Sequence, residues 1–358
     1  MKYWSELTRK LEPYVPGEQP KDRKYIKLNT NESPYPPSPE VLNAIKGAEL
    51  EDLRLYPEPE SSDLREKVAE YYNIDKDQIF VGNGSDEVLA FSFMAFFDPG
   101  QPILYPEISY SFYPVYSSLF NIDYHLVKMN EDFSLKLDGF KRNNGGVIFA
   151  NPNAPTGICI LLEEVRDILD YNMQNNQGSV VIVDEAYIDF GGESAIKLID
   201  EYPNLLVIHT LSKSRALAGM RIGLAFGKKE LIDGLNRVKN SFNSYTIDRL
   251  AQIAAGKAVE DHEYFQKTRK KIIETRERVA DVLRGMGFVV LPSKTNFLFI
   301  SHIDYYAEEL FKALRQEGIL VRYFKQERID NFLRVSIGTE HEMDIFIEKI
   351  SSIINTYQ

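Results

Sequence analysis

A lysine stands close to the end of an apolar segment, in a position that favours amine chemistry. Residues 205–210 (LLVIHT) form the kind of apolar run that is buried on both faces as a strand, and Lys213 follows shortly after it. A lysine at the mouth of a buried strand is poorly hydrated, which favours a neutral amine that can attack a carbonyl carbon. Arg221 lies eight positions later and could hold an anion near that amine. The alternative is a solvated loop lysine, and this segment alone favours neither interpretation.

Three other polar clusters directly follow predicted strands. They are GNGSDE at residues 82–87 after a strand at 78–81, NPNAPTG at 151–157 after 146–150, and DEAY at 184–187 after 179–183. In an open α/β sheet, ligands bind outside the carboxyl ends of the strands. We therefore expect all four clusters, including the one with the lysine, to gather on one rim of one sheet.

Each cluster also has a purely structural interpretation. GNGSDE leads into a predicted helix, where backbone N–H groups favour an anion, but Ser85 could instead cap that helix. It is not a dinucleotide fingerprint, because Glu87 stands where the third glycine would be. Asp184 ends an apolar strand, so its carboxylate is expected to be buried against a cation or against backbone amides. Tyr187 could reach the same pocket or serve as a packing aromatic, and NPNAPTG indicates only a rigid turn.

Strands that alternate with helices position these clusters. The apolar runs are continuous, which indicates an α/β fold with a mainly parallel sheet covered by helices on both faces. Ser38 with Pro39 predicts a helix start, and Ser61 or Ser62 is expected to cap the next helix. Many prolines between residues 28 and 39 exclude a regular helix or central strand there, and the chain before them is expected to form an extended arm. Further helices are predicted at about 87–97, 113–120, 162–175 and 261–286, and further strands at 102–105, 124–129, 221–226, 295–300, 319–322 and 332–337.

Composition limits the possible partners. The chain has 358 residues, and its formal net charge of -11 makes nucleic acid or an anionic membrane surface an unfavourable partner. Cys159 is the single cysteine, so no internal disulfide can form and a reducing compartment fits. No apolar signal core or membrane-length apolar run is found, so the expected location is the cytoplasm. No metal site is predicted.

Taken together, the rim offers a nucleophilic amine, an anion cradle with an arginine, a buried carboxylate and a phenol, which are the groups that pyridoxal phosphate requires. The chain resembles the fold-type I pyridoxal-phosphate-dependent aminotransferases, and within them it is similar to the histidinol-phosphate aminotransferase family. The resemblance extends in the right order over nearly the whole chain. The matching segments are LNTNESPYPP from Leu28, YPEP, GNGSDE, ISYSFY, NPNAPTG, VDEAYIDF, TLSK with LAGMRIG, and FLRVSIGT from Phe332.

The resemblance implies roles for residues of the rim. Lys213 would form the Schiff base with the cofactor and then move the proton of the substrate Cα, while Asp184 would keep the ring nitrogen protonated. Tyr187 would donate to the phenolate oxygen of the ring, and Tyr110 would stack on the ring face. The cofactor phosphate would be surrounded by Gly84, Ser85, Asp86, Ser212 and Arg221.

The resemblance also implies a shared site and one departure from the family. Tyr56 would reach the cofactor phosphate of the neighbouring subunit, so the protein would be a homodimer. In the family's NPxNPTG turn, an asparagine directly before PTG contacts the phenolate oxygen, but Ala154 stands there in this chain. Two alternatives follow: Asn153 substitutes for that asparagine, or the contact is absent.

The substrate would be held by residues from both ends of the chain. Arg334, in LRVSIGT, would meet the anionic group of the substrate with help from Arg322, since arginine suits both carboxylate and phosphate. Tyr14 and Asn29, in the N-terminal arm, would close over the substrate. The expected domains are the arm at residues 1–29, a large cofactor-binding α/β domain at 30–240, and a smaller α+β domain at 241–358.

The implied reaction exchanges an amino group between histidinol phosphate and 2-oxoglutarate, in histidine biosynthesis, to give imidazole acetol phosphate and glutamate. Alternatives with the same cofactor are an aminotransferase for aromatic or other amino acids and a decarboxylase of a phosphorylated amino acid. A non-catalytic regulator would need a DNA-binding domain, and the arm before Leu28 is too short to supply one.

Overall fold

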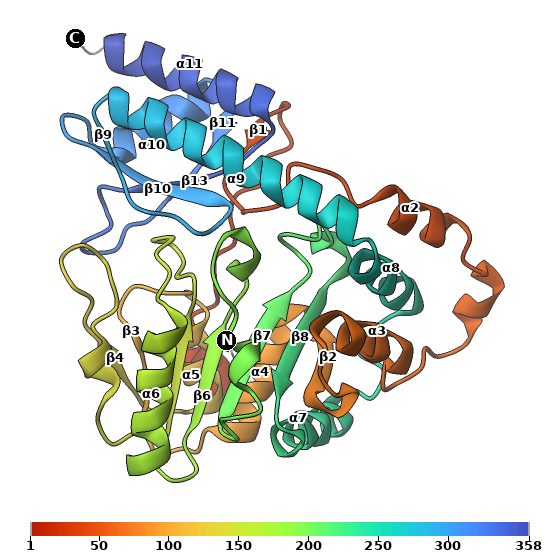
Figure 1. Cartoon of the computed structure of the whole chain (residues 1–358). Coiled ribbons are helices and arrows are strands. Elements are labelled where there is room, and N and C mark those ends of the chain that lie inside the picture. Colours follow the sequence, from red (N-terminus) through yellow and green to blue (C-terminus); the bar gives the residue numbers. More distant parts are fainter. Residues whose placement is uncertain (1, 357–358) are drawn as a thin grey trace.

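A seven-stranded sheet forms the centre of the larger part of the molecule (Figure 1). The computed structural model describes residues 2–356. All neighbouring strands pair in parallel except β8, which is antiparallel to both of its neighbours, so the other six strands point the same way. The strand order is β2 (Ile79–Asn83), β8 (Ile222–Gly227), β7 (Leu205–Thr210), β6 (Val180–Asp184), β5 (Gly146–Ala150), β3 (Ile103–Pro106) and β4 (Tyr124–Val127). The prediction of a mainly parallel α/β sheet is therefore confirmed.

Helices cover both faces of this sheet because its strands bury side chains on both sides. Along β7, Leu205 and Val207 belong to one apolar cluster, and Leu206 and Ile208 belong to another on the opposite face. The first face is covered by α2 (Pro39–Lys46), α3 (Ser62–Tyr72), α6 (Leu162–Asn175) and α8 (Arg249–Glu260). The second is covered by α4 (Gly84–Phe96), α5 (Tyr113–Phe120) and α7 (Lys229–Phe242).

The C-terminal part has its own apolar core and a smaller antiparallel sheet. The strands lie in the order β12 (Arg322–Tyr323), β13 (Leu333–Ser336), β10 (Phe297–His302) and β9 (Phe288–Val290). Three helices pack on it, namely α9 (His262–Gly285), α10 (Ala307–Gln316) and α11 (Glu340–Thr356). The described residues also contain six short 3-10 helices: η1 (Leu50–Arg54), η2 (Lys76–Gln78), η3 (Leu137–Phe140), η4 (Ile188–Phe190), η5 (Ala195–Leu198) and η6 (Ala218–Met220).

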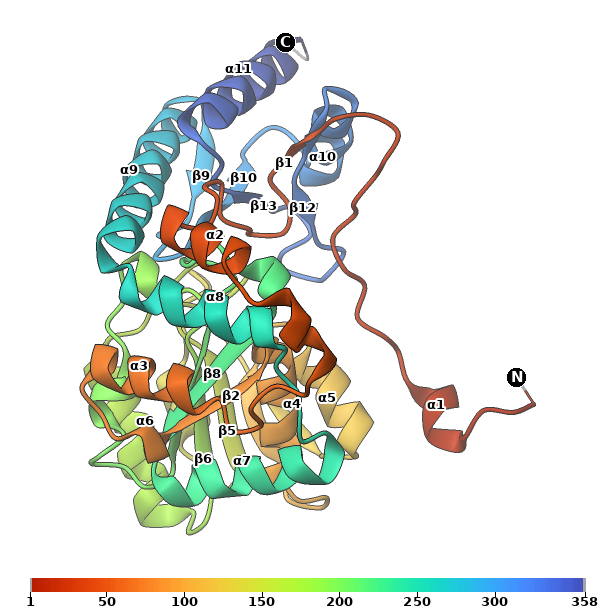
Figure 2. The same ribbon diagram turned by 90° about the vertical axis from the view of Figure 1, so that its right-hand side faces the viewer.

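The N-terminal arm contains more regular structure than the sequence predicts. A short helix, α1 (Glu6–Lys10), begins where the hydroxyl of Ser5 accepts from the amide of Thr8. Figure 2 shows the arm running from α1 along the outside of the molecule to β1 (Ile26–Lys27). There β1 pairs in parallel with β11 (Ile319–Leu320), which fixes the arm to the C-terminal part.

Two predicted helix starts are wrong in their details. The helix that follows GNGSDE begins at Gly84, so Ser85 lies within its first turn and is not its cap. Before α3, Ser61 occupies the cap position with a φ of 51° and makes no side-chain cap bond. The carboxylate of Glu58 accepts from the amide of Ser62 instead, at 2.8 Å. The cap of α2 by Ser38 is confirmed.

The expected domain boundary between residues 240 and 241 falls within the last turn of α7, before α8 begins. Helix α8 packs on the larger sheet together with α2 and α3, and Ala251 and Ala254 lie in the same apolar cluster as Leu64. We therefore propose that the first domain extends to about Glu260 and that the second begins with α9. No helix within residues 2–356 is long and apolar enough to span a membrane.

Candidate active site

A cavity of about 270 Å³ lies at the rim where β2, β5, β6 and β7 end. Its volume is close to the lower end of the range for small-molecule pockets. Three of the four polar clusters contribute side chains to it, and NPNAPTG contributes Ala154. The lining residues are Thr30, Glu32, Ser85, Asp86, Tyr110, Ala150, Ala154, Asp184, Ala186, Tyr187, Thr210, Ser212, Lys213, Ala218 and Arg221.

Lys213 lies in this cavity on the turn that joins β7 to β8. The turn is fixed by backbone hydrogen bonds from Leu211 to Ile222 and from Leu217 to Leu211. The Nζ atom of Lys213 lies 3.3 Å from the carbonyl oxygen of Thr30, to which it donates, and 5.7 Å from the ring centre of Tyr187. The amine therefore lies between the N-terminal segment and the aromatic ring that follows β6.

Asp184 is buried at the end of β6, as predicted, but its protein partners are neutral. Its carboxylate accepts from the hydroxyl of Tyr113 at 3.0 Å and from the amide of Ala186 at 3.2 Å. Burial raises the pKa of Asp184 to about 6. A buried acid without a cationic partner is suited to a ligand that brings a positive charge, such as a protonated pyridine ring.

Tyr187 lines the same cavity, and an asparagine fixes its hydroxyl group. Nδ2 of Asn31 donates to the hydroxyl of Tyr187 at 2.9 Å, and Oδ1 of Asn31 accepts from the hydroxyl of Ser336 at 2.8 Å. Because the lone pair of Tyr187 is used in this way, its own proton remains for another acceptor. Asn31 is not among the site residues predicted from the sequence, although it belongs to LNTNESPYPP, one of the segments that carry the family resemblance.

The start of α4 forms a cradle with Arg221. Gly84 has a φ of 80°, which strains any other residue, and a Cβ atom there would lie 2.4 Å from Nη2 of Arg221 and push the guanidinium away. Nη2 of Arg221 lies 3.3 Å from Oδ2 of Asp86, whose Oδ1 accepts from the hydroxyl of Tyr110 at 2.7 Å. With Ser85 and Ser212 also in the lining, the cradle combines a helix N-terminus, an arginine and hydroxyl groups. This set of donors suits a phosphate.

Asn153 is not among the residues that line the cavity, which favours the alternative in which the contact with the phenolate oxygen is absent. Its Nδ2 donates to the carbonyl of Ile108 and to the hydroxyl of Thr156, both at 3.0 Å. Its Oδ1 accepts from the hydroxyl of Ser109 at 2.9 Å. Both N–H groups of the amide and its oxygen are therefore engaged within the protein, and Ala154 is the residue of NPNAPTG that lines the cavity.

The two candidate substrate arginines lie directly opposite each other on adjacent antiparallel strands. Arg322 on β12 pairs in register with Arg334 on β13. Nη2 of Arg334 donates to the carbonyl of Asn29 at 3.3 Å, and Nη2 of Arg322 donates to the carbonyl of Val15 at 3.1 Å. Burial lowers the pKa of Arg334, and its Nε is buried without a partner among the described residues. Facing like charges are destabilising unless an anion lies between them.

The two candidate residues of the arm lie beside these arginines, whereas Tyr56 does not line the cavity. Asn29 is buried, and its Nδ2 donates to the carbonyl of Glu18 at 2.9 Å. The ring of Tyr14 stacks on Phe112 at 4.4 Å. Tyr56 is 77% exposed on the surface of its own chain.

Comparison with known proteins identifies the family. The family model for aminotransferase class I and II matches residues 23–350. The chain is 58% identical over 354 residues to a histidinol-phosphate aminotransferase of Clostridium botulinum (strain Okra / Type B1), covering 99% of both chains. It is 60% identical over 353 residues to a histidinol-phosphate aminotransferase of Clostridium acetobutylicum, again covering 99% of both.

The fold matches solved structures at lower sequence identity. A histidinol-phosphate aminotransferase from Sinorhizobium meliloti, solved in complex with pyridoxal-5'-phosphate, aligns with a TM-score of 0.89 and 24% identity, over 100% of this chain and 99% of that chain. An aspartate aminotransferase variant from Thermus thermophilus aligns with a TM-score of 0.84 and 18% identity, over 99% of this chain and 100% of that chain. These likenesses concern the fold. With the family match over most of its length and relatives of this similarity, the chain belongs to the class I and II aminotransferases.

Proposed function

We propose that this aminotransferase uses pyridoxal phosphate to exchange an amino group between histidinol phosphate and 2-oxoglutarate, giving imidazole acetol phosphate and glutamate, in histidine biosynthesis. The structural observation that supports an anionic substrate is the facing pair Arg322 and Arg334. Neither guanidinium makes an ion pair within residues 2–356, and each donates to a backbone carbonyl of the N-terminal arm. The names of the relatives agree with a phosphorylated donor.

The residues of the cavity fit the cofactor. Bound pyridoxal phosphate supplies a carbonyl carbon open to amine attack and a ring that withdraws electrons from the substrate Cα. Lys213 would hold the cofactor covalently and then carry the Cα proton. Asp184 would accept from the ring N–H as the anion of an ion pair, which would supply the cationic partner that this buried carboxylate lacks in the protein. The Gly84–Arg221 cradle would hold the phosphate, with Ser85, Asp86 and Ser212 around it.

The other roles follow from the contacts of each side chain. Tyr187 would donate to the phenolate oxygen, since Asn31 donates to Tyr187 and leaves its proton available. Tyr110, whose hydroxyl is held by Asp86, would pack its ring on the cofactor face. Arg334 and Arg322 would bind the substrate phosphate, while Asn29 and Tyr14 would cover it from the arm.

We propose a homodimer in which Tyr56 of each chain completes the site of the other. Its exposure on its own chain supports this role, as does the neighbouring exposed apolar surface formed by Leu50, Leu53, Leu55, Phe242 and Tyr245. We propose that the protein acts in the cytoplasm. This reducing compartment is compatible with a chain whose single cysteine, Cys159, cannot form an internal disulfide.

Amine-donor profiling tests the substrate. Purified protein loaded with pyridoxal phosphate would be given histidinol phosphate, phenylalanine, tyrosine or threonine phosphate with 2-oxoglutarate, and glutamate would be measured. We expect the highest kcat/KM with histidinol phosphate. A higher value with an aromatic amino acid would replace the proposed substrate, and release of carbon dioxide from a phosphorylated amino acid would replace the reaction.

A further inference from the structure

The surface loop at residues 55–61, here called the Tyr56 loop, carries the exposed side chain of Tyr56 on a backbone that several side chains hold by hydrogen bonds. Three of its carbonyl oxygens accept hydrogen bonds from side chains of α7 and α8. Nζ of Lys239 donates to the carbonyl of Pro59 at 2.7 Å, Nε2 of Gln252 to that of Glu58 at 3.1 Å, and Nη2 of Arg249 to that of Tyr56 at 3.4 Å. The ring of Tyr56 stacks on Tyr245, with centres 4.5 Å apart. The side chain is therefore exposed while its backbone is fixed.

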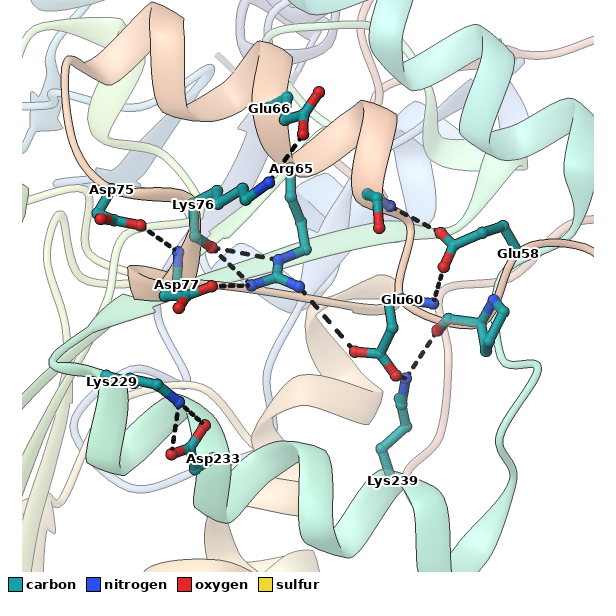
Figure 3. Close-up of polar contacts among 12 residues, drawn as sticks. Glu58, Glu60, Arg65, Glu66, Asp75, Lys76, Asp77, Lys229, Asp233 and Lys239 are labelled. Carbon is teal, nitrogen blue, oxygen red and sulfur yellow. Dashed lines mark hydrogen bonds and ion pairs between the residues drawn. The ribbon is translucent and has the colours of Figure 1, made fainter.

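Acidic side chains of the loop complete the fastening, as Figure 3 shows. Glu58 accepts from the amides of Glu60 and Ser62, at 3.0 and 2.8 Å, which joins the loop to the first turn of α3. Oε1 of Glu60 lies 3.6 Å from Nζ of Lys239, and Oε2 of Glu60 lies 4.0 Å from Arg65. The loop is thus held between α3 and α7.

Lys239 stands out among these groups because it is only 2% exposed. Lysine is rarely buried to this extent, because removing the ammonium from water is costly unless good partners replace the water. Its partners are the Pro59 carbonyl and Glu60, and both belong to the Tyr56 loop. By contrast, Lys229 on the same helix is exposed and forms a surface ion pair with Asp233, one helical turn away, at 2.7 Å (Figure 3).

We propose that Lys239 is a positioning residue for the active site of the neighbouring subunit. It holds the Tyr56 loop so that the Tyr56 hydroxyl is presented where the second copy of the chain binds the cofactor phosphate. This inference rests on the proposed function, in which Tyr56 acts across the dimer. Alternatively, Lys239 could affect the active site of its own chain through Glu87. The charge of Lys239 favours the ionised form of Glu87, whose carboxylate accepts from the amide of Asn83, next to the phosphate cradle.

Hybrid dimers separate the two routes. Two chains with different affinity tags would be co-expressed, one carrying Lys213→Ala, and doubly tagged dimers would be purified and freed of cofactor. Covalent capture of pyridoxal phosphate, fixed with borohydride, can then occur only on the chain that retains Lys213. In the trans arm, Lys239→Met is placed on the Lys213→Ala chain. In the cis arm, it is placed on the chain that retains Lys213.

The trans arm should raise the cofactor concentration needed for half-maximal capture by about tenfold or more, since misplacement of a contacting group by about an ångström is costly. The cis arm and the matched control Lys229→Met should leave it unchanged. An effect in the cis arm alone would assign Lys239 to its own site through Glu87 and overturn the proposal. No effect in either arm would also overturn it.

Tyr56→Phe in the trans arm distinguishes failure of this inference from failure of the proposed function. If Tyr56→Phe weakens capture and Lys239→Met does not, Tyr56 acts across the dimer and only the role of Lys239 is wrong. If neither weakens capture, the role proposed for Tyr56 also fails. Should Lys239→Met prevent folding, Gln252→Ala removes a second donor to the same loop and must weaken capture in the trans arm only.

Discussion

The hydroxyl of Tyr113, on α5, donates to the carboxylate of Asp184, on β6, at 3.0 Å. Burial raises the pKa of Tyr113 well above its ordinary value, so this phenol remains a proton donor. Asp184 is thereby oriented without being neutralised, and its pKa is raised to about 6 by burial. The apoprotein thus keeps a costly carboxylate in place for a positively charged ligand.

Asp184→Asn should change how the stability of the apoprotein depends on pH. The folded pKa of about 6 lies above the ordinary 3.8, so the folded state binds more protons between these values and stability falls as pH rises through them. Above pH 6 the carboxylate costs about 3 kcal/mol, and the variant lacks this cost. Urea unfolding of both apoproteins at several pH values measures the difference. A difference that stays constant from pH 4 to 7 would contradict the prediction.

The same substitution should have the opposite effect on function. With the cofactor bound, Asp184→Asn removes one partner of a buried pair, typically a loss of about 3–5 kcal/mol. We expect a folded protein that has lost almost all transamination, measured as glutamate formation. Activity within a few-fold of the parent would make Asp184 a purely structural acid.

Lys213→Ala should abolish covalent attachment of pyridoxal phosphate. The unmodified protein should be yellow, and borohydride should fix the cofactor to the peptide that contains Lys213. The variant can still hold the cofactor through the cradle at Gly84 and Arg221, so dialysis should remove it slowly. Mass spectrometry after borohydride treatment checks the attachment, with Lys229→Ala as control. Labelling of a different lysine would contradict the assignment.

A mixture of Tyr56→Ala and Lys213→Ala chains should recover activity when subunits exchange. Each hybrid dimer contains one site with an intact Lys213 and with Tyr56 from its neighbour. Each variant is first assayed alone, since recovery is visible only if Tyr56→Ala has low activity. Mixed chains that exchange subunits, as followed by differential tags, yet gain no activity would show that Tyr56 does not act across the dimer.

Arg334→Lys should mainly raise the KM for histidinol phosphate. Lysine keeps the positive charge but lacks the planar guanidinium that faces Arg322. The lost charge-assisted hydrogen bonds are worth roughly 1.5–3 kcal/mol, which corresponds to an increase in KM of about ten- to a hundredfold. Steady-state kinetics measures the change, and Arg278→Lys on the surface of α9 serves as control. An effect confined to aromatic amino acid donors would favour the alternative substrate class.

Sequence patterns predicted the central sheet well because its strands are buried on both faces. The strands at 146–150 and 205–210 and the helices at 113–120 and 162–175 have the predicted limits. Long apolar runs bounded by polar residues leave few alternatives. Lys213, Asp184 and Tyr187 meet in one cavity because parallel strands end on one rim, a rule that needs no knowledge of side-chain contacts.

Features that depend on contacts between distant segments were missed or misjudged. The pairing of β1 with β11 joins segments about 290 residues apart and involves two residues on each strand, too few to leave a pattern. The sequence left open whether Asn153 reaches the cavity, and only its hydrogen bonds with Ile108, Ser109 and Thr156 show how its amide is engaged. Asn31 was overlooked because its partners, Tyr187 and Ser336, come from remote parts of the chain.

The pairing of β1 with β11 also has a consequence for biogenesis. The larger sheet is complete once residue 227 has been synthesised, so its rim can form while the rest of the chain is still on the ribosome. The wall at residues 29–31, whose Thr30 carbonyl accepts from Lys213, is fixed by backbone bonds between Leu28, Leu320 and Ser336. These partners emerge last. A nascent chain therefore exposes Lys213 without its wall, and the site closes only after nearly the whole chain has been synthesised.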